Sequence, residues 1–143
     1  MKKRKQKKFV THSIWVDPYG FWVVYVAGPD IAGARDAIAK EFSETPLSEK
    51  RGEPNLCDFL DPDDERFADR MTDGWFLWRD ESSNFVLYFP SLHPEIKVIA
   101  HEVYHAVRRT SKNFNLESDR DEPEAYLFEK IFGTILEKLR GKK

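Results

Sequence analysis

Two short runs of β-branched and aromatic residues near the start of the chain share the hydrophobic pattern of strands. The runs Ile14–Val16 and Phe21–Val26 are separated by the four residues 17–20, Asp-Pro-Tyr-Gly. This is a turn sequence, with proline preset for the first corner and glycine at the end. The pattern therefore predicts a β-hairpin.

The hydrophobic period changes after this hairpin. Gly28 and Pro29 break the strand, and Asp30 is placed to cap a helix that runs from about Ile31 to Phe42. An amphipathic helix carries its apolar residues on one side. The residues expected on that side are Ile31, Ala34, Ile38 and Phe42.

Residues 43–74 lack a regular hydrophobic period and are rich in proline and acidic residues. A connection of this length inside a compact domain is usually functional or disordered. We expect a short helix around Glu65–Met71. The acidic stretch Asp58–Asp73 lacks the ordered alternation of a calcium loop. It is interpreted as a solvated loop that partly covers a cleft.

The second half of the chain predicts another hairpin and two helices. The runs Trp75–Trp78 and Phe85–Phe89 flank a polar connection and are typical of paired strands. Pro94 is suited to the first position of a helix that continues to about Arg109. A last helix is expected from near Pro123 to about Leu139. This order predicts an α+β fold with a mainly antiparallel, twisted sheet.

Composition adds limits to this picture. The 143 residues fit a single domain, assigned to residues 9–143, after a basic arm at residues 1–8 that we interpret as disordered. No apolar run approaches the roughly 20 residues that span a bilayer, so no membrane association is expected. The single Cys57 excludes an intramolecular disulfide and fits a reducing compartment. The absence of an export signal in the basic arm also favours a cytoplasmic location.

The sequence H-E-x-x-H occupies residues 101–105, inside the predicted helix. Residues four apart lie one turn apart on the same helix face, so the imidazoles of His101 and His105 can reach one zinc ion. Glu102 projects beside them, where a carboxylate can accept a proton from metal-activated water. The pattern predicts two zinc ligands and a catalytic base.

The rest of this helix supports that interpretation. Its apolar residues form a stripe that can pack on the sheet, and His101 and His105 lie on the opposite side. The expected stripe consists of Ile96, Ile99, Ala100, Val103 and Val107. The helix can therefore bury one face and still present both imidazoles to a cleft.

A catalytic zinc usually has three protein ligands and a water, so a third ligand is needed. No histidine follows His105, and the candidates are Glu122 and Glu124 at the start of the last helix. Glu124 falls within the apolar arc of that helix. Glu122 falls outside the arc but precedes Pro123, at a cap position where helical angles do not apply. Helical spacing leaves both candidates open.

These motifs resemble those of a known group of proteins. H-E-x-x-H, followed on a second helix by E-x-x-A-Y at residues 122–126, resembles the small zincin-type metallopeptidases that are common in phages and mobile elements. They are reduced relatives of the glutamate-zincins. The resemblance implies that His101, His105 and Glu122 bind Zn²⁺ and that Glu102 is the general base. It also implies a catalytic role for Tyr126, supporting a ligand or the oxyanion.

The sequence thus leads us to expect a minimal zincin-like fold and a zinc-dependent hydrolase, a metallopeptidase acting on a peptide or protein substrate. The strand at residues 84–90, before the metal helix, is expected to form the rim of the cleft, where a substrate could add as an extra strand. One alternative is a metal-binding zincin-fold protein without proteolytic activity. A second is a nucleic-acid accessory module that uses residues 2–8 and Lys142-Lys143. The net charge of −2 argues against nucleic acid as a partner.

Overall fold

The computed structural model describes residues 8–41, 59–68, 72–80, 82–114 and 122–141. Several sequence-based expectations concern residues outside these ranges. They include nearly all of the basic arm, Cys57, most of the connection at residues 43–74, and Lys142-Lys143. The statements below refer to the described residues.

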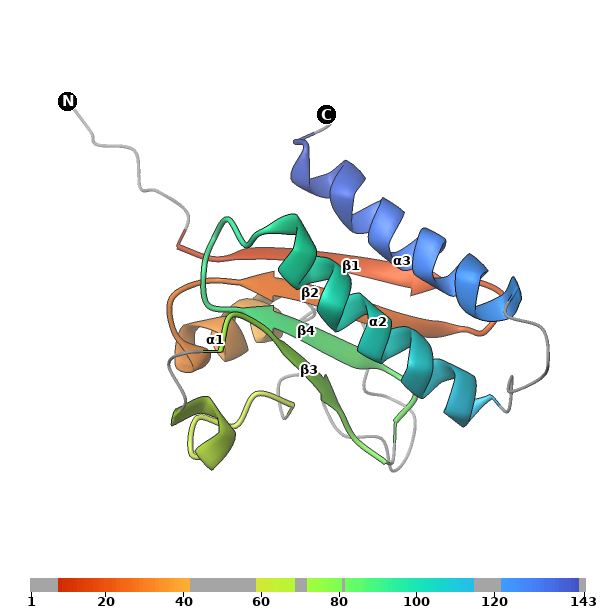
Figure 1. Cartoon of the computed structure of the whole chain (residues 1–143). Helices are drawn as coiled ribbons and strands as arrows, with labels where there is room; N and C mark the ends of the chain where they lie inside the picture. The colour runs from red at the N-terminus through yellow and green to blue at the C-terminus, as the bar shows by residue number, and fades with distance from the viewer. Residues whose placement is uncertain (1–7, 42–58, 69–71, 81, 115–121, 142–143) are drawn as a thin grey trace.

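The chain forms an α+β fold in which a mixed sheet is covered by helices on both faces (Figure 1). The described strands are β1 (Val10–Val16), β2 (Phe21–Ala27), β3 (Trp75–Trp78) and β4 (Phe85–Phe89), in the order β1-β2-β4-β3. The pairs β1–β2 and β3–β4 are antiparallel, whereas β2 and β4 are parallel. The predicted α+β fold is confirmed, but the sheet is mixed, with a parallel pair at its centre that was not expected.

Both predicted hairpins are present. In the first, Val16 pairs with Phe21 across the turn, and the amide of Gly20 donates to the carbonyl oxygen of Val16 at 2.8 Å. Gly20 has a φ of 75°, a conformation that glycine adopts at no steric cost. The strand β1 begins at Val10, earlier than its apolar run indicated, because polar residues occupy its first half.

The expected position of the cleft rim was wrong. Strand β4, which was predicted to lie at the rim, is paired on both sides, with β2 and with β3. All five of its residues are buried, as is typical of a strand covered on both faces. An incoming peptide therefore cannot pair with β4. Among the described residues, β3 is the edge strand on this side of the sheet.

Three α-helices lie within the described residues: α1 (Ile31–Glu41), α2 (Ile96–Asn113) and α3 (Glu122–Leu139). Asp30 caps α1 as predicted, because its Oδ1 accepts a hydrogen bond from the amide of Gly33 at 2.6 Å. The short helix expected near Glu65 is the 3₁₀ helix η2 (Glu65–Ala68).

The predicted start of the helix that carries the H-E-x-x-H motif was also wrong. Pro94 precedes the helix, because the N-cap Glu95 has the extended angles φ −64° and ψ 145°. No side chain caps the helix at Glu95, and just before it the hydroxyl of Ser91 accepts a hydrogen bond from the amide of His93 at 3.1 Å. Helix α2 then continues to Asn113, beyond the predicted Arg109.

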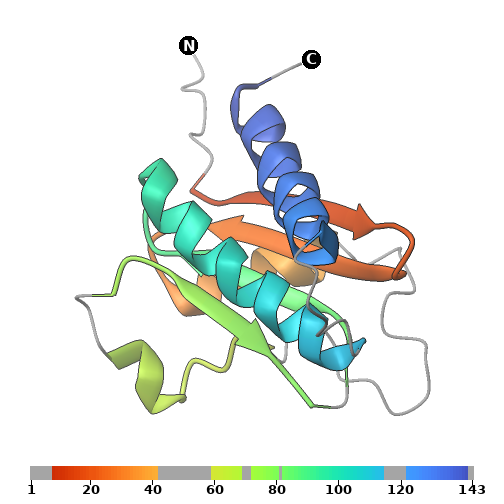
Figure 2. The same ribbon diagram turned by 45° about the vertical axis from the view of Figure 1, so that its right-hand side comes forward.

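The helices cover the two faces of the sheet unequally. Helices α2 and α3 lie side by side on one face, and α1 lies on the other (Figures 1 and 2). Alternate residues of β2 and β4 point into two separate hydrophobic cores. Val23, Leu87 and Phe89 contribute to the core under α2 and α3. Val24 and Val86 contribute to the core under α1.

Membrane insertion finds no support in the described helices. None of them combines the length and the apolar character that a bilayer-spanning segment needs.

Candidate metal centre

Two imidazoles stand together on the outer face of α2. The Nε2 atoms of His101 and His105 are 3.1 Å apart, and both side chains are exposed. Two nitrogens bound to one zinc at about 2.0–2.1 Å with tetrahedral angles lie about 3.3 Å apart. The observed separation fits a pair of ligands to one ion.

The opposite face of α2 holds the pair in place. Ile99, Val103 and Val107 are buried against the sheet, as the apolar stripe predicted. Ala106 is also buried, although it was not part of that prediction. Ile96 was wrongly assigned to the stripe: it is the first residue of the helix and is 62 % exposed.

Glu102 is buried between α2 and the sheet, and its side chain is only 9 % exposed. Its Oε2 lies 4.0 Å from Nε2 of His101, so the carboxylate approaches the imidazoles from the inner side. Burial raises the pKa of Glu102 above its ordinary value, and the nearby His101 and His105 partly oppose this shift. A carboxyl group in such a position is suited to proton transfer.

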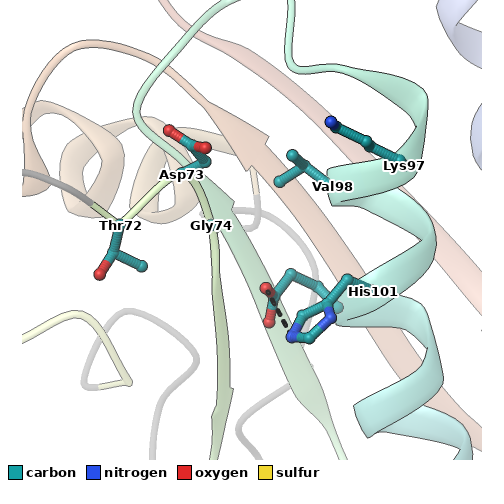
Figure 3. Close-up of a pocket in the computed structure, with 7 residues that line it drawn as sticks. Thr72, Asp73, Gly74, Lys97, Val98 and His101 are labelled. Atoms are coloured by element: carbon teal, nitrogen blue, oxygen red, sulfur yellow. Dashed lines mark ion pairs between the residues drawn. The ribbon is translucent and has the colours of Figure 1, made fainter.

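A pocket of about 380 Å³ opens beside this carboxylate. It lies between the segment that leads into β3 and the first turns of α2 (Figure 3). Its lining consists of Thr72, Asp73, Gly74, Lys97, Val98, His101 and Glu102. Residues 72–74 belong to the end of the acidic connection, so this part of it contributes to the cleft.

Gly74 permits the close approach of β3 to α2. A Cβ at this position would lie 2.9 Å from the Phe89 ring and 3.2 Å from Cγ of Glu102. Any other residue would displace one of these groups, and Phe89 is fixed in the core. The glycine therefore helps to keep the Glu102 carboxylate in its buried position.

The edge strand β3 runs along the same side of α2. The ring of Phe76 stacks on His105, with 6.1 Å between the ring centroids. Further along, Arg109 lies over Trp78 at 3.8 Å from the ring centroid and donates to Asp80 at 2.9 Å. The histidines thus lie next to the sheet edge that β3 forms.

The structure separates the two candidates for the third ligand. Glu122 is the first residue of α3, and its side chain is outside the described set. Glu124 faces α2, where its Oε2 accepts a hydrogen bond from Nη1 of Arg108 at 2.7 Å. Within the described residues, no three side chains of His, Cys, Asp or Glu are close enough to hold a metal ion. A third ligand from the described residues would therefore have to move toward the histidines.

Tyr126 is not brought together with the histidines. Its hydroxyl donates to the carbonyl oxygen of Asp17 at 3.1 Å, in the turn between β1 and β2. This turn belongs to the edge of the sheet opposite β3. In this position Tyr126 fastens the first turn of α3 to the sheet, at a distance from the cleft.

Sequence reasoning missed Arg108, Gly74 and Phe76. A signal for Arg108 was present, because His101, His105 and Arg108 are spaced i, i+4 and i+7 and share one helix face. Gly74 lines the pocket and Phe76 contacts His105 because β3 is an edge strand beside α2, and its place at the edge was not indicated by the hairpin pattern.

Comparisons of the chain with models of protein families, with curated proteins and with solved structures find no match. The resemblance to zincin-type metallopeptidases therefore rests on the motif residues of the sequence. The functional argument rests on those residues and on the geometry described above.

Proposed function

We propose that this α+β protein is a zinc-dependent metallopeptidase with a minimal zincin-like fold. The observation that carries the proposal is the arrangement of three side chains on α2. The Nε2 atoms of His101 and His105 are 3.1 Å apart, and the buried carboxylate of Glu102 is 4.0 Å from the first of them. This is the geometry that two zinc ligands and an adjacent general base require.

The ion pair between Arg108 and Glu124 supports Glu124 as the third ligand. Arg108 shares a helix face with both histidines, and the carboxylate that it binds would have to move along α2 to join them. The side chain of Glu122 lies outside the described set, and Glu122 is retained as the alternative ligand.

Each side chain has a defined task in this proposal. Zinc, when bound, polarises the scissile carbonyl and lowers the pKa of a water toward about 7. Glu102 accepts a proton from that water and transfers it to the leaving amine. The burial that raises the pKa of Glu102 favours its protonated form, which the second transfer needs.

The substrate in this proposal is an extended peptide. Its main chain would pair with the outer edge of β3, beside His105, instead of with β4 as the sequence suggested. The pocket at Gly74 would receive a side chain adjacent to the scissile bond. Its volume of about 380 Å³ exceeds that of one large side chain.

The proposal can be tested by incubating the zinc-loaded protein with a library of unstructured peptides and identifying the products by mass spectrometry. The matched variant is Glu102→Gln, which keeps the size of the side chain but cannot accept the proton. We expect the wild type to cleave and the variant to be slower by about 10²- to 10⁴-fold, with the same zinc content.

The other outcomes are equally informative. A protein that binds zinc but cleaves no peptide would be a metal-binding zincin-fold protein without proteolytic activity. Cleavage that is equal in wild type and Glu102→Gln would come from a contaminating peptidase and would contradict the proposal.

A further inference from the structure

We propose that a groove between the start of α2 and the end of α3 binds an aliphatic carboxylate of the class of medium-chain fatty acids. This inference goes beyond the proposed function and does not depend on a metal. The start of α2 and the end of α3 lie at the same end of the molecule (Figures 1 and 2). A pocket of about 280 Å³ opens between them, and it shares no lining residue with the pocket beside Glu102.

The lining of this groove is mainly aliphatic. It is formed by the segment before α2, the first turn of α2 and the last turn of α3, which contribute Leu92, Pro94, Ile96, Ile99, Leu136 and Leu139. Ile96 is 62 % exposed, and Leu92 and Leu136 are half-buried. A ligand that covers these side chains removes apolar surface from water, which favours binding.

The interior of the groove suits a hydrocarbon chain better than a peptide. Among the described residues, the polar side chains that line it are those of His93 and Arg140. A peptide carries an N–H and a C=O at each residue, and each needs a partner when it is buried. An unbranched hydrocarbon chain carries neither. The volume of about 280 Å³ is near the lower limit of roughly 300–1,000 Å³ that is usual for ligand pockets, so it fits a chain of medium length.

Arg140 determines the charge of the ligand's polar end. Its side chain is exposed at the groove and forms no ion pair with the described residues. A guanidinium group is always charged, and its N–H donors match the two oxygens of a carboxylate. Charge complementarity therefore favours a carboxylate over a neutral or a cationic group at the end of the chain.

The neighbouring acidic residues do not occupy this position. Glu95 is paired with Lys97 at 3.7 Å, and neither of them lines the groove. Glu137 is exposed and does not line it either. Helix α2 has no side-chain cap at its start, so the positive end of its dipole adds to the effect of Arg140. The charges around the groove therefore favour an anionic ligand.

The test is a titration of the isotope-labelled full chain, without added metal, followed by the amide chemical shifts in two-dimensional NMR spectra. Sodium octanoate is the probe. Octanol and octylamine carry the same chain with a neutral or a cationic end. An acetylated dipeptide that ends in leucine offers a carboxylate of polypeptide origin. The four ligands separate the contribution of the chain from that of the charge.

The variants are Arg140→Gln, Arg140→Lys and Ile96→Asp, with Lys138→Gln as the matched control. Lys138 is an exposed cation in the last turn of α3 that does not line the groove. Ile96→Asp places a negative charge in the groove, at an exposed position in the first turn of a helix where aspartate is favourable. Thermal unfolding shows whether each variant folds as the wild type does.

We expect octanoate to shift the amides of Ile96 and Leu139 and to leave that of Ile38, in the core under α1, unchanged. Octanoate should bind about 10-fold more tightly than octanol or octylamine. Arg140→Gln should raise the Kd of octanoate by about 10-fold, and Arg140→Lys should recover part of this loss. Ile96→Asp should abolish binding, and Lys138→Gln should bind as the wild type does.

Several results would overturn the inference. Octanol that binds as tightly as octanoate, or an unchanged Kd in Arg140→Gln, would show that the carboxylate is not recognised. Shifts confined to other surfaces, or no saturable shift at all, would remove the site. Tighter binding of the dipeptide would identify the ligand as the C-terminus of a polypeptide. Because no metal takes part, each of these failures is distinct from a failure of the proposed function.

Discussion

The two faces of the sheet are formed by the same strands, but they are covered by different helices and bury different polar groups. Under α1 the core consists of hydrophobic residues, and the hydroxyl of Tyr88 donates to the carbonyl oxygen of Gly28 at 3.1 Å. Under α2 and α3 the larger core includes Tyr25, whose hydroxyl has no partner among the described residues. Helix α2 also buries the carboxylate of Glu102 there.

This difference shows where the fold can place chemistry. The α1 face has paired polar groups and contributes stability. The α2 face buries a carboxylate beside exposed imidazoles. Burial of a carboxylate lowers the free energy of unfolding, and proteins tolerate such a loss where the groups act together in a function. If the α2 face holds a functional site and the α1 face only stabilises the fold, substitutions on the two faces should change different measured quantities.

The largest effect on stability is expected from the α1 face. Ile38 is 1 % exposed in the core under α1, and Ile38→Ala should lower the free energy of unfolding by about 2–5 kcal/mol. Zinc affinity of the folded protein should not change, because the histidines lie on the other face. Urea denaturation in excess chelator and chelator competition measure the two quantities.

The control for this prediction is Asp36→Ala, at an exposed position of the same helix. It should alter stability by no more than about 0.5 kcal/mol. A loss of zinc affinity in folded Ile38→Ala would show that the two faces are coupled, against the comparison drawn here.

The next effect concerns the border between β3 and α2. Gly74→Ala places a Cβ against the Phe89 ring and Glu102, so we expect a loss of about 1–3 kcal/mol in the free energy of unfolding. Gly133→Ala is the matched control in α3, where a Cβ meets no atom within 4 Å of the described structure. It should gain about 1 kcal/mol from helix propensity. Equal effects of both substitutions on urea denaturation would contradict the close packing at Gly74.

The two buried tyrosines provide the smallest and most direct comparison of the faces. Tyr88→Phe should lower the free energy of unfolding by about 1 kcal/mol, because the hydroxyl's hydrogen bond to the carbonyl oxygen of Gly28 is lost. Tyr25→Phe should be neutral or stabilising, because its hydroxyl is buried without a partner in the described residues. Urea denaturation at neutral pH compares them, and an equal loss in both variants would contradict this account.

The same pair predicts the response to alkaline pH. Burial raises the pKa of Tyr25 and of Tyr88 from 10 to about 12, and the nearby Asp30 adds to the shift at Tyr88. The folded protein therefore keeps both phenols protonated where the unfolded chain has begun to lose them. This contribution to stability is complete below about pH 10 and is lost as the pH rises through about 12. Tyr25→Phe and Tyr88→Phe should therefore each reduce the loss of stability between about pH 10 and pH 12.

The elements of the fold could be predicted from local patterns. The β-branched and aromatic run at residues 21–26 and the turn before it gave the first hairpin, and the period of Ile99, Val103 and Val107 gave the helix with its exposed histidines. These features depend on residues close together in the sequence. The order of the strands depends on pairing between distant segments, and the parallel contact of β2 with β4 was not predicted.

One signal for that pairing was present in the sequence. The run Phe85–Phe89 is hydrophobic without alternation, as expected of a strand that is buried on both faces and lies inside a sheet. The placement of Tyr126 and Arg108 could not be deduced in the same way. Each depends on how α3 lies relative to α2 and to the β1–β2 turn, which the helical period alone does not determine.

The central claim is that His101 and His105 bind zinc together with a carboxylate of α3. The most direct test is the metal content of the untagged protein by mass spectrometry, for wild type, His105→Ala, Glu122→Ala and Glu124→Ala. We predict about one zinc per chain in wild type and in Glu122→Ala, and little or none in His105→Ala and Glu124→Ala. A wild-type protein that carries no metal and takes up none on zinc titration would contradict the account.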